Sequence, residues 1–486
     1  MNPTAQPKAK TITMTIAVAA VAAALGWQIA EENYLAPSLL AVTAAAVIVT
    51  VTGRMPSGAT LLGLLLFGYM VGNRGFAQLM PFPQVPLLPA EIFLAGGVGW
   101  LLWQGARSKQ LPARTDALNV CILIWILIGS SRIAMDVRAH GALALRDFAT
   151  VYYALFFFIA QRLSDEPAAR VVVVRFLIAG SLLQPPVYAL SEMFPGFFLD
   201  ALALRGAPLI YFKGDLALTF TAASSTLIAL VAPVRWRRWS WPAASIGILA
   251  VIGNENRASM VAALSALIWL AFSRARRLAA LQLSTIIIAL ICTLALTFLA
   301  DSRWAGKKLD GVTERLASIS DFAGQGAYHS DESYMKGDNN RFRSLWWTEV
   351  VAETVRESPW IGLGFGHDLA REFLRIYSPG SGEDFSARSP HSILVTVFGR
   401  MGLIGFVPFV AICTALMIRL ISTLRSNETE TARLGLWLAA WIILTSSLFG
   451  VVLEGPMGAV LFWSVAGLAN GWPEAPGSSD ASPLPR

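Results

Sequence analysis

Long apolar segments recur along the whole chain, and they leave few architectures open to it. A helix needs about 20 mostly apolar residues to cross a bilayer. Fourteen segments approach this length, of which 241–254 and 451–470 are short or interrupted by glycine and are candidates for re-entrant helices. We therefore predict an all-α polytopic membrane protein with about 12–14 transmembrane helices. The segments are 12–29, 35–52, 57–73, 86–104, 117–134, 147–163, 171–190, 216–234, 241–254, 257–273, 279–300, 392–421, 433–449 and 451–470.

The composition agrees with a surface that faces lipid. Of the 486 residues, 55% are hydrophobic and only 14% are charged, whereas about a quarter of a soluble protein is charged. The net charge of +7 suits contact with anionic membrane lipids and does not indicate nucleic acid. Cys121, Cys292 and Cys413 lie in apolar runs without metal-ligand spacing, so we expect neither a metal site nor a disulfide framework.

The distribution of Lys and Arg predicts the orientation. Lys8 and Lys10 precede the first apolar run; a signal peptide is one reading, but we interpret the run as an uncleaved first span because further spans follow directly. Short basic connections then fall on every second loop, which places them and the N-terminus in the cytoplasm. These connections are 106–109 with Arg114, Arg162 with Arg170, 235–238, 274–277, and Arg419 with Arg425 and Arg433.

The long polar loop 301–388 then lies outside, in the periplasm of a bacterial inner-membrane protein. It holds eleven Lys and Arg and fourteen Asp and Glu, so it lacks the basic excess of the inner loops. Residues 343–356 show the spacing of an amphipathic surface helix, and 321–339 is expected to form a mobile cover. The predicted parts are an N-terminal membrane bundle 1–300, the loop 301–388, C-terminal membrane helices 389–470 and a cytoplasmic tail 471–486.

All four histidines and several arginines fall on the predicted outer side. The positive-inside rule expects these loops to be poor in arginine, so their cations indicate an anionic ligand as well as simple snorkelling to headgroups. The residues are His140, His329, His367, His391, Arg74, Arg132, Arg138, Arg146, Arg205, Lys213 and Arg257.

Three polar motifs surround the long loop. The turn 253–259 places Arg257 at the mouth of a helix, 340–347 leads into the Gly-rich segment 358–366, and 387–392 precedes 398–405. Each has a plain structural reading, namely an interhelical turn, an amphipathic helix ended by Pro and Gly, and a polar cap. No phosphate-binding Gly loop, dinucleotide fingerprint, His-Glu-x-x-His or Asp-x-Asp is present, so we expect no cofactor and no metal.

In order and placement, these motifs resemble the O-antigen ligase and polysaccharide polymerase family of bacterial envelopes. Arg343 and Trp347 have the spacing of its Arg-x-x-x-Trp, 359–364 fits Pro-x-x-Gly-x-Gly, and His391 with 402–405 matches its last element. The style is closest to exopolysaccharide-associated members. The resemblance covers 254–405. It departs from the family at Asn256, where Ser is usual, and at Ser392, where Asn is usual, and 205–218 matches too loosely to assign a role to Arg205 or Lys213.

The resemblance implies an inverting, metal-independent glycosyl transfer from an undecaprenyl-diphosphate-linked glycan to an acceptor hydroxyl. His391 would be the catalytic base or orient the acceptor, with His367 as second choice. Arginine suits diphosphate because its planar fork matches phosphate oxygens. The expected ligands of the diphosphate are Arg257, Arg343, Arg388, Arg341 and Arg146.

The expected partners are the lipid-linked oligosaccharide, a glycan or lipid acceptor, membrane lipids and polysaccharide export machinery. The sequence leaves ligase and polymerase both open, and it identifies neither the sugar nor the acceptor. The alternative class is a lipid-linked glycan flippase or another transporter. The absence of an internal repeat and the position of the charges at the outer rim favour the enzyme.

Overall fold

The computed structural model describes residues 57–79, 88–109, 113–204, 206–254, 256–299, 331–377, 388–425 and 431–473, together with 306, 310, 313, 314, 317 and 321. The two predicted spans before residue 57, the predicted tail after 473, His329 and most of the predicted cover 321–339 lie outside the residues whose side chains are described. Within the described residues the protein is helical, apart from one two-residue hairpin, Ala203–Leu204 (β1) with Ala207–Pro208 (β2).

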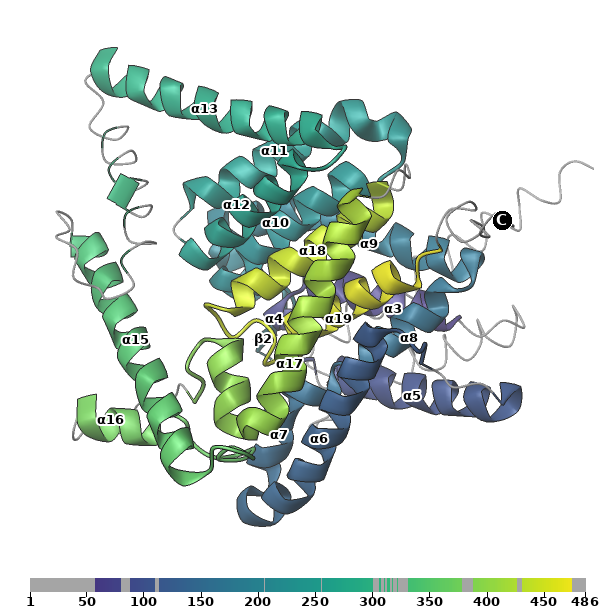
Figure 1. Ribbon diagram of the computed structural model, residues 1–486. Coiled ribbons are helices and arrows are strands. Elements are labelled where there is room, and N and C mark those ends of the chain that lie inside the picture. Colours follow the sequence, from purple (N-terminus) through teal and green to yellow (C-terminus); the bar gives the residue numbers. More distant parts are fainter. Residues whose placement is uncertain are drawn as a thin grey trace, which may run out of the picture.

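Each of the twelve predicted spans in the described part of the chain contains a helix. Their sequence order is shown by colour in Figure 1. The helices are α3 (Gly58–Val71), α5 (Pro89–Ser108), α6 (Ala117–His140), α7 (Ala142–Tyr152) with α8 (Leu155–Ser164), α9 (Pro167–Met193), α10 (Gly214–Leu230), α11 (Arg237–Gly253), α12 (Arg257–Ala271), α13 (Arg276–Leu299), α17 (Ile393–Arg425), α18 (Thr431–Ser447) and α19 (Pro456–Gly471). Short elements are α4 (Arg74–Ala77), η1 (Phe197–Ala201) and η2 (Val234–Trp236).

Five of the helical segments described here are long and apolar enough to cross a membrane: α6, α7 with α8, α9, most of α13, and α17. The pair α10 and η2–α11 would count as a sixth, broken or re-entrant span, because it bends by 111°. These features define an integral membrane protein. Of the other helices, α5 has 20 residues, and α3, α12, α18 and α19 have 14–17, or about 21–26 Å at 1.5 Å per residue.

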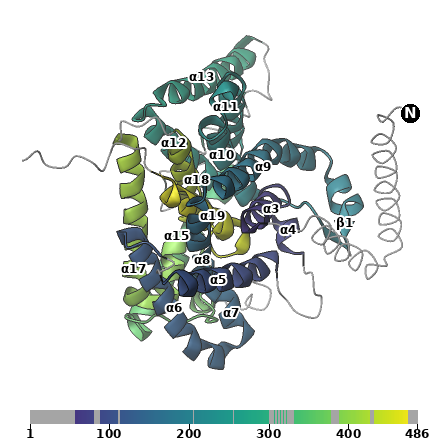
Figure 2. The ribbon, with the colours of Figure 1, turned by 90° about the vertical axis from the view of Figure 1, so that its right-hand side faces the viewer.

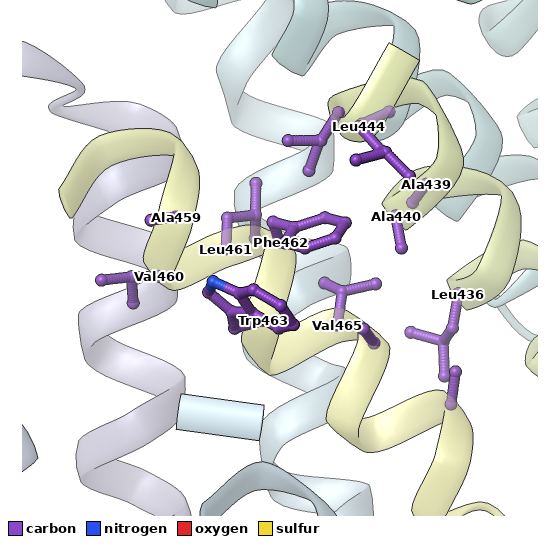
Figure 3. Packing of buried hydrophobic residues seen from close by; sticks show 14 of the residues in the cluster. Leu436, Ala439, Ala440, Leu444, Ala459, Val460, Leu461, Phe462, Trp463 and Val465 are labelled. Carbon is purple, nitrogen blue, oxygen red and sulfur yellow. The ribbon is translucent and has the colours of Figure 1, made fainter. Parts of the chain in front are cut away.

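The centre of the bundle is formed by α10, α18 and α19. All residues of α10 from Leu216 to Leu230 are buried, including its Ser and Thr residues. Figure 3 shows the tight packing between α18 and α19, where Phe462 and Trp463 lie among Leu, Val and Ala side chains. The site described below is therefore built on rigid elements.

The predicted inner loops meet at one end of this bundle. Arg114 forms an ion pair with Asp165 at 2.5 Å and donates to the carbonyl oxygen of Asn470 at 2.9 Å. At the same end, Arg419 contacts Asp116 at 3.3 Å. His391 and Glu454 lie at the opposite ends of α17 and α19. The structure thus separates the two predicted sets of loops, while the side that faces the periplasm stays a prediction.

Two helices, α15 and α16, lie between α13 and α17 in the described part of the sequence. α15 (Asp331–Glu357) contains the predicted amphipathic segment 343–356, and α16 (Arg371–Tyr377) packs against it. α15 runs beside the bundle rather than through it (Figure 1). Trp346, Val350 and Phe373 form a small separate core between α15 and α16. The C-terminal end of α15 leads into the Gly-rich segment, which returns to the membrane helices.

Candidate functional site

α17 is broken at Gly402, and the break joins the helix to the Gly-rich turn 358–366. Gly402 has φ 58° and ψ −161°. Such a break deprives backbone groups of their helical partners, which is expensive at membrane depth. Two amides of the turn donate to carbonyl oxygens of α17, and two amides of α17 donate to carbonyl oxygens of the turn. The bonds run from Leu363 to Gly399 (2.7 Å), Gly364 to Arg400 (3.1 Å), Leu403 to Pro359 (2.9 Å) and Ile404 to Trp360 (3.0 Å).

Glycine is required at both sides of this junction. Gly362 has φ 73°, and a Cβ there would lie 2.4 Å from the carbonyl carbon of Arg400. A Cβ on Gly402 would lie 2.5 Å from the amide nitrogen of Gly362. The two glycine motifs noted in the sequence therefore make one structure, in which two backbones approach more closely than any side chain would allow.

Two buried carboxylates from α6 and α7 hold the other end of the turn. The amide of Phe365 donates to Asp136 Oδ2 at 2.7 Å, and the amide of Gly366 donates to Asp147 Oδ2 at 3.0 Å. Each carboxylate also contacts arginine. These pairs are Arg132 Nε to Asp136 Oδ2 (3.0 Å), Arg400 Nη1 to Asp147 Oδ2 (2.8 Å) and Arg146 Nη2 to Asp147 Oδ1 (3.2 Å). α6 and α17, which lie side by side (Figure 2), are thereby bridged through the turn.

Arg388 and Arg146, two of the predicted diphosphate ligands, lie at this turn. Arg388 Nη2 donates to the carbonyl oxygen of Gly366 at 2.7 Å, and Arg146 contacts Asp147. Both contacts stabilise the backbone of the turn. A role of either residue in binding diphosphate stays a prediction.

His391 lies just before α17, in a constrained conformation. Its φ is 57°, which is unfavourable for a residue other than glycine and marks strain held in place by the surroundings. Its Nδ1 lies 2.9 Å from the carbonyl oxygen of Ser389. A carbonyl oxygen can only accept, so we assign the proton to Nδ1, and Nε2 keeps its lone pair. Trp347 Nε1 donates to the neighbouring carbonyl of Pro390 at 2.5 Å.

Two cations from separate elements, Arg343 and Lys213, act on this histidine, and a third, Arg257, acts on Arg343. Arg343 of α15 is mostly buried, and burial and then the neighbouring charge of Arg257 lower its pKa, while Asp215 opposes the shift. Burial also lowers the pKa of His391, followed by the charge of Arg343 and, more weakly, of Lys213. The bond to the Ser389 carbonyl opposes that change. His391 is therefore held neutral and able to accept a proton, beside a concentration of positive charge.

A ladder of buried hydroxyl groups fixes the helices that carry these cations. Asn256 caps α12 by accepting from the amide of Ser259 at 2.9 Å, which places Arg257 in the first turn. Ser259 Oγ donates to the backbone carbonyl of Asp215 at 3.1 Å. Thr219 Oγ1 lies 3.0 Å from Ser259 Oγ and 2.7 Å from Ser446 Oγ. These contacts tie together the ends of α10, α12 and α18.

The end of α18 supplies a direct contact to the site. Arg343 Nη1 donates to the carbonyl oxygen of Phe449, just after α18, at 3.0 Å. Five segments distant in the sequence thus meet here: the start of α10, the start of α12, the middle of α15, the approach to α17 and the end of α18.

Two other predicted residues lie elsewhere. Arg341 is exposed on α15, two positions from Arg343 and hence on a different face of the helix. His367, the second-choice base, forms an ion pair with the buried Glu353 at 3.1 Å. Burial raises the pKa of Glu353, and His367 opposes that rise. The ring of His367 therefore contacts a carboxylate, whereas the described hydrogen bond of the His391 ring is to the backbone carbonyl of Ser389.

Sequence reasoning named Lys213 among the outer cations but assigned it no role, and it missed two further residues of the site, Asp215 and Glu454. Lys213 Nζ lies 3.7 Å from Asp215 Oδ2, and the charges of both act on His391. Glu454 Oε1 accepts from Ser389 Oγ at 2.6 Å. A signal for Glu454 was present in the sequence, because it is an acidic residue inside the apolar segment 451–470, and an ionisable residue in such a segment is a candidate functional residue.

The fold and these contacts define an integral membrane protein with a cationic site around one neutral histidine. Residues 242–410 match the family model described as O-antigen ligase. The match contains Arg257, Arg343 and His391, and it agrees with the resemblance expected for 254–405. Lys213, Asp215 and Glu454 lie outside it. No curated protein matches the chain.

Proposed function

We propose that the protein transfers a glycan from a polyprenyl-diphosphate carrier to an acceptor hydroxyl at the periplasmic face of the bacterial inner membrane. The observation that carries the proposal is the meeting of Lys213, Arg257 and Arg343 beside His391. Their charges are close enough to depress the pKa values of two neighbouring groups, so an anion bound among them would be stabilised. A lipid diphosphate supplies such an anion and belongs to the chemistry of ligases and polymerases in general.

The proposed reaction is a single displacement. Nε2 of His391 takes the proton of the acceptor hydroxyl as the acceptor oxygen bonds to the anomeric carbon. The bond from that carbon to the phosphate oxygen breaks, and the lipid diphosphate leaves with the electron pair. Arg257 and Arg343 stabilise the charge that develops on the leaving oxygen. One displacement inverts the configuration at the anomeric carbon.

The neutral state of His391 is central to this role. A protonated imidazole has no lone pair with which to accept the acceptor proton. The lowered pKa keeps the ring neutral near physiological pH, and the Ser389 carbonyl directs the free lone pair to Nε2. Arg343 thus has two proposed roles: it stabilises the diphosphate, and its charge helps to keep the base neutral.

The alternative class, a lipid-linked glycan flippase, draws on one observation. The Arg400–Asp147 pair is buried beside a membrane helix, and charges at such depth are typical of transporters. In this chain, however, Asp147 of the pair also accepts a hydrogen bond from the amide of Gly366. The pair therefore stabilises the backbone of the turn. The structure therefore favours transfer over transport.

The test uses purified protein in proteoliposomes with an undecaprenyl-diphosphate-linked oligosaccharide. Product formation is compared with movement of the donor across the bilayer. We expect transfer by the unchanged protein, and a loss on the order of 10²–10⁴-fold for His391→Ala, as for other residues that act in proton transfer. Arg343→Ala is expected to lose transfer as well, because the leaving group loses stabilisation.

Arg356→Ala is the matched control, since Arg356 lies on the same helix and is exposed beside Glu357. It should keep full transfer. Transfer at the unchanged rate in folded His391→Ala would refute the role of the base, and donor movement without any transfer would support the flippase.

A further inference from the structure

Glu454 lies in the turn between α18 and α19, outside the family match. Its Oε1 accepts two hydrogen bonds from the segment that leads into α17. Ser389 Oγ donates at 2.6 Å, and Thr396 Oγ1 donates at 2.9 Å. A carboxylate that accepts short bonds from two hydroxyl groups is held firmly in place. The turn before α19 is thereby fixed to the residues on both sides of His391.

Ser389 connects Glu454 to His391. The hydroxyl of Ser389 has one proton, and that proton is donated to Glu454. Its oxygen can therefore only accept from the backbone amide of His391, which lies 3.3 Å away. The carbonyl of Ser389 accepts from Nδ1 of the ring at 2.9 Å. One residue thus holds both the backbone and the ring of His391, and Glu454 fixes the orientation of that residue.

The backbone of His391 needs such support. A non-glycine residue with φ 57° is strained and persists only where neighbouring contacts hold it. Trp347 holds Pro390 and Glu454 holds Ser389, the two residues that precede His391. Without the second contact, the segment is free to relax to an ordinary conformation that turns Nε2 away.

The charge of Glu454 is balanced by groups from other elements. Burial raises its pKa, while Ser389, Arg400 and Thr396 oppose that rise, and Asp147 adds to it. Arg400 belongs to α17 and Asp147 to α7, where they form their own ion pair. Its contacts with the segment around His391 are the hydrogen bonds from Ser389 and Thr396. We therefore infer that it acts on His391 through these bonds.

We propose that Glu454 is a positioning residue for the transfer reaction: through Ser389 it holds His391 with the proton on Nδ1 and the lone pair of Nε2 directed to the acceptor. This inference rests on the proposed function of His391 as the base. It assigns a catalytic consequence to an acidic residue distant from the matched family segment, and it makes the turn before α19 part of the site.

The test compares Glu454→Ala with Glu454→Gln in the proteoliposome assay. The amide oxygen of glutamine accepts from both hydroxyl groups, so Glu454→Gln should keep kcat within about threefold, as expected when a neutral acceptor replaces a charged one. Glu454→Ala should lower kcat on the order of 10²-fold, because misplacement of a catalytic group by about 1 Å has an effect of that size. The KM for the acceptor should change little in both.

A pH profile separates positioning from simple loosening of the fold. The bond to the Ser389 carbonyl raises the pKa of His391. If Glu454→Ala weakens that bond, the pKa falls, and the acidic limb of kcat/KM moves to lower pH. Glu454→Gln should keep the limb in place. A uniformly reduced profile with an unmoved limb in Glu454→Ala would contradict the inference.

Ser389→Ala and Thr396→Val complete the design. Ser389→Ala breaks the link to His391 and should resemble Glu454→Ala, and the double variant Ser389→Ala with Glu454→Ala should be no worse than either alone, because both break one pathway. Thr396→Val removes one bond to Glu454 and a long contact of 3.5 Å with Ser389 Oγ, but it leaves the 2.6 Å bond from Ser389 to Glu454 in place, so its loss should be several-fold smaller. If Glu454→Ala does not fold, Ser389→Ala decides by the same two measurements.

The outcomes distinguish this inference from the proposed function. An active Glu454→Ala together with an inactive His391→Ala overturns the role of Glu454 and leaves the base intact. Full activity of folded His391→Ala overturns the proposed function itself. Equal losses in Thr396→Val and Ser389→Ala show a structural role of the whole turn and count against positioning.

Discussion

The Gly-rich turn and the surroundings of His391 both contain arginine residues, but the two regions differ in how many carboxylates lie beside these cations. At the turn, Arg132, Arg400 and Arg146 lie against Asp136 or Asp147, and the charges balance locally. Around His391, Asp215 acts on Arg343 and forms an ion pair with Lys213, and the pKa values of Arg343 and His391 are lowered. The first arrangement stabilises the fold, whereas the second is the site that we propose binds an anionic ligand.

The largest expected effect tests the balanced region. Asp147→Ala leaves Arg400 buried without its carboxylate and removes the partner of the Gly366 amide. Loss of one partner of a buried pair costs about 3–5 kcal/mol, so we expect a large drop in thermal stability in detergent and little folded protein. Arg343→Ala, measured in parallel, should keep its stability, and an equal loss of stability in both would erase the distinction between the two regions.

A smaller effect is expected from Arg343→Lys. The charge is kept, but the planar fork that matches two phosphate oxygens is lost. We expect transfer to fall by about tenfold, the equivalent of about 1.4 kcal/mol, with unchanged thermal stability. Arg388→Lys is the companion measurement. If it lowers transfer equally without loss of stability, Arg388 binds the diphosphate and does more than hold Gly366.

The smallest effect is a displacement of the pH profile. Arg343 and Lys213 lower the pKa of His391, in addition to burial. Lys213→Met removes one of these charges, so the pKa of His391 should rise towards its ordinary value. The protonated, inactive form then persists to higher pH, and the acidic limb of kcat/KM should move to higher pH. A limb that stays in place, or moves to lower pH, would mean that Lys213 does not act on His391.

The sequence predicts the helices well because apolar length is a local property. It also predicts the meeting of Arg257, Arg343 and His391, since the family motifs carry that information. It does not separate Arg388 from Arg343, because an arginine beside a Gly-rich turn looks the same whether its partner is a carbonyl oxygen or a phosphate. The sequence does not predict roles for Lys213 and Glu454, because only the packing of α10 and α19 brings these residues to the site.

The break at Gly402 has a consequence for the assembly of the protein in the membrane. The hydrogen bonds that close the turn 358–366 are shared with α17, so neither part can be complete before the other is in place. Docking of the turn onto α17 therefore completes the helix and the turn in one event. A fragment of the loop without α17 would lack the partners of these hydrogen bonds, so the junction forms only in a chain that contains both.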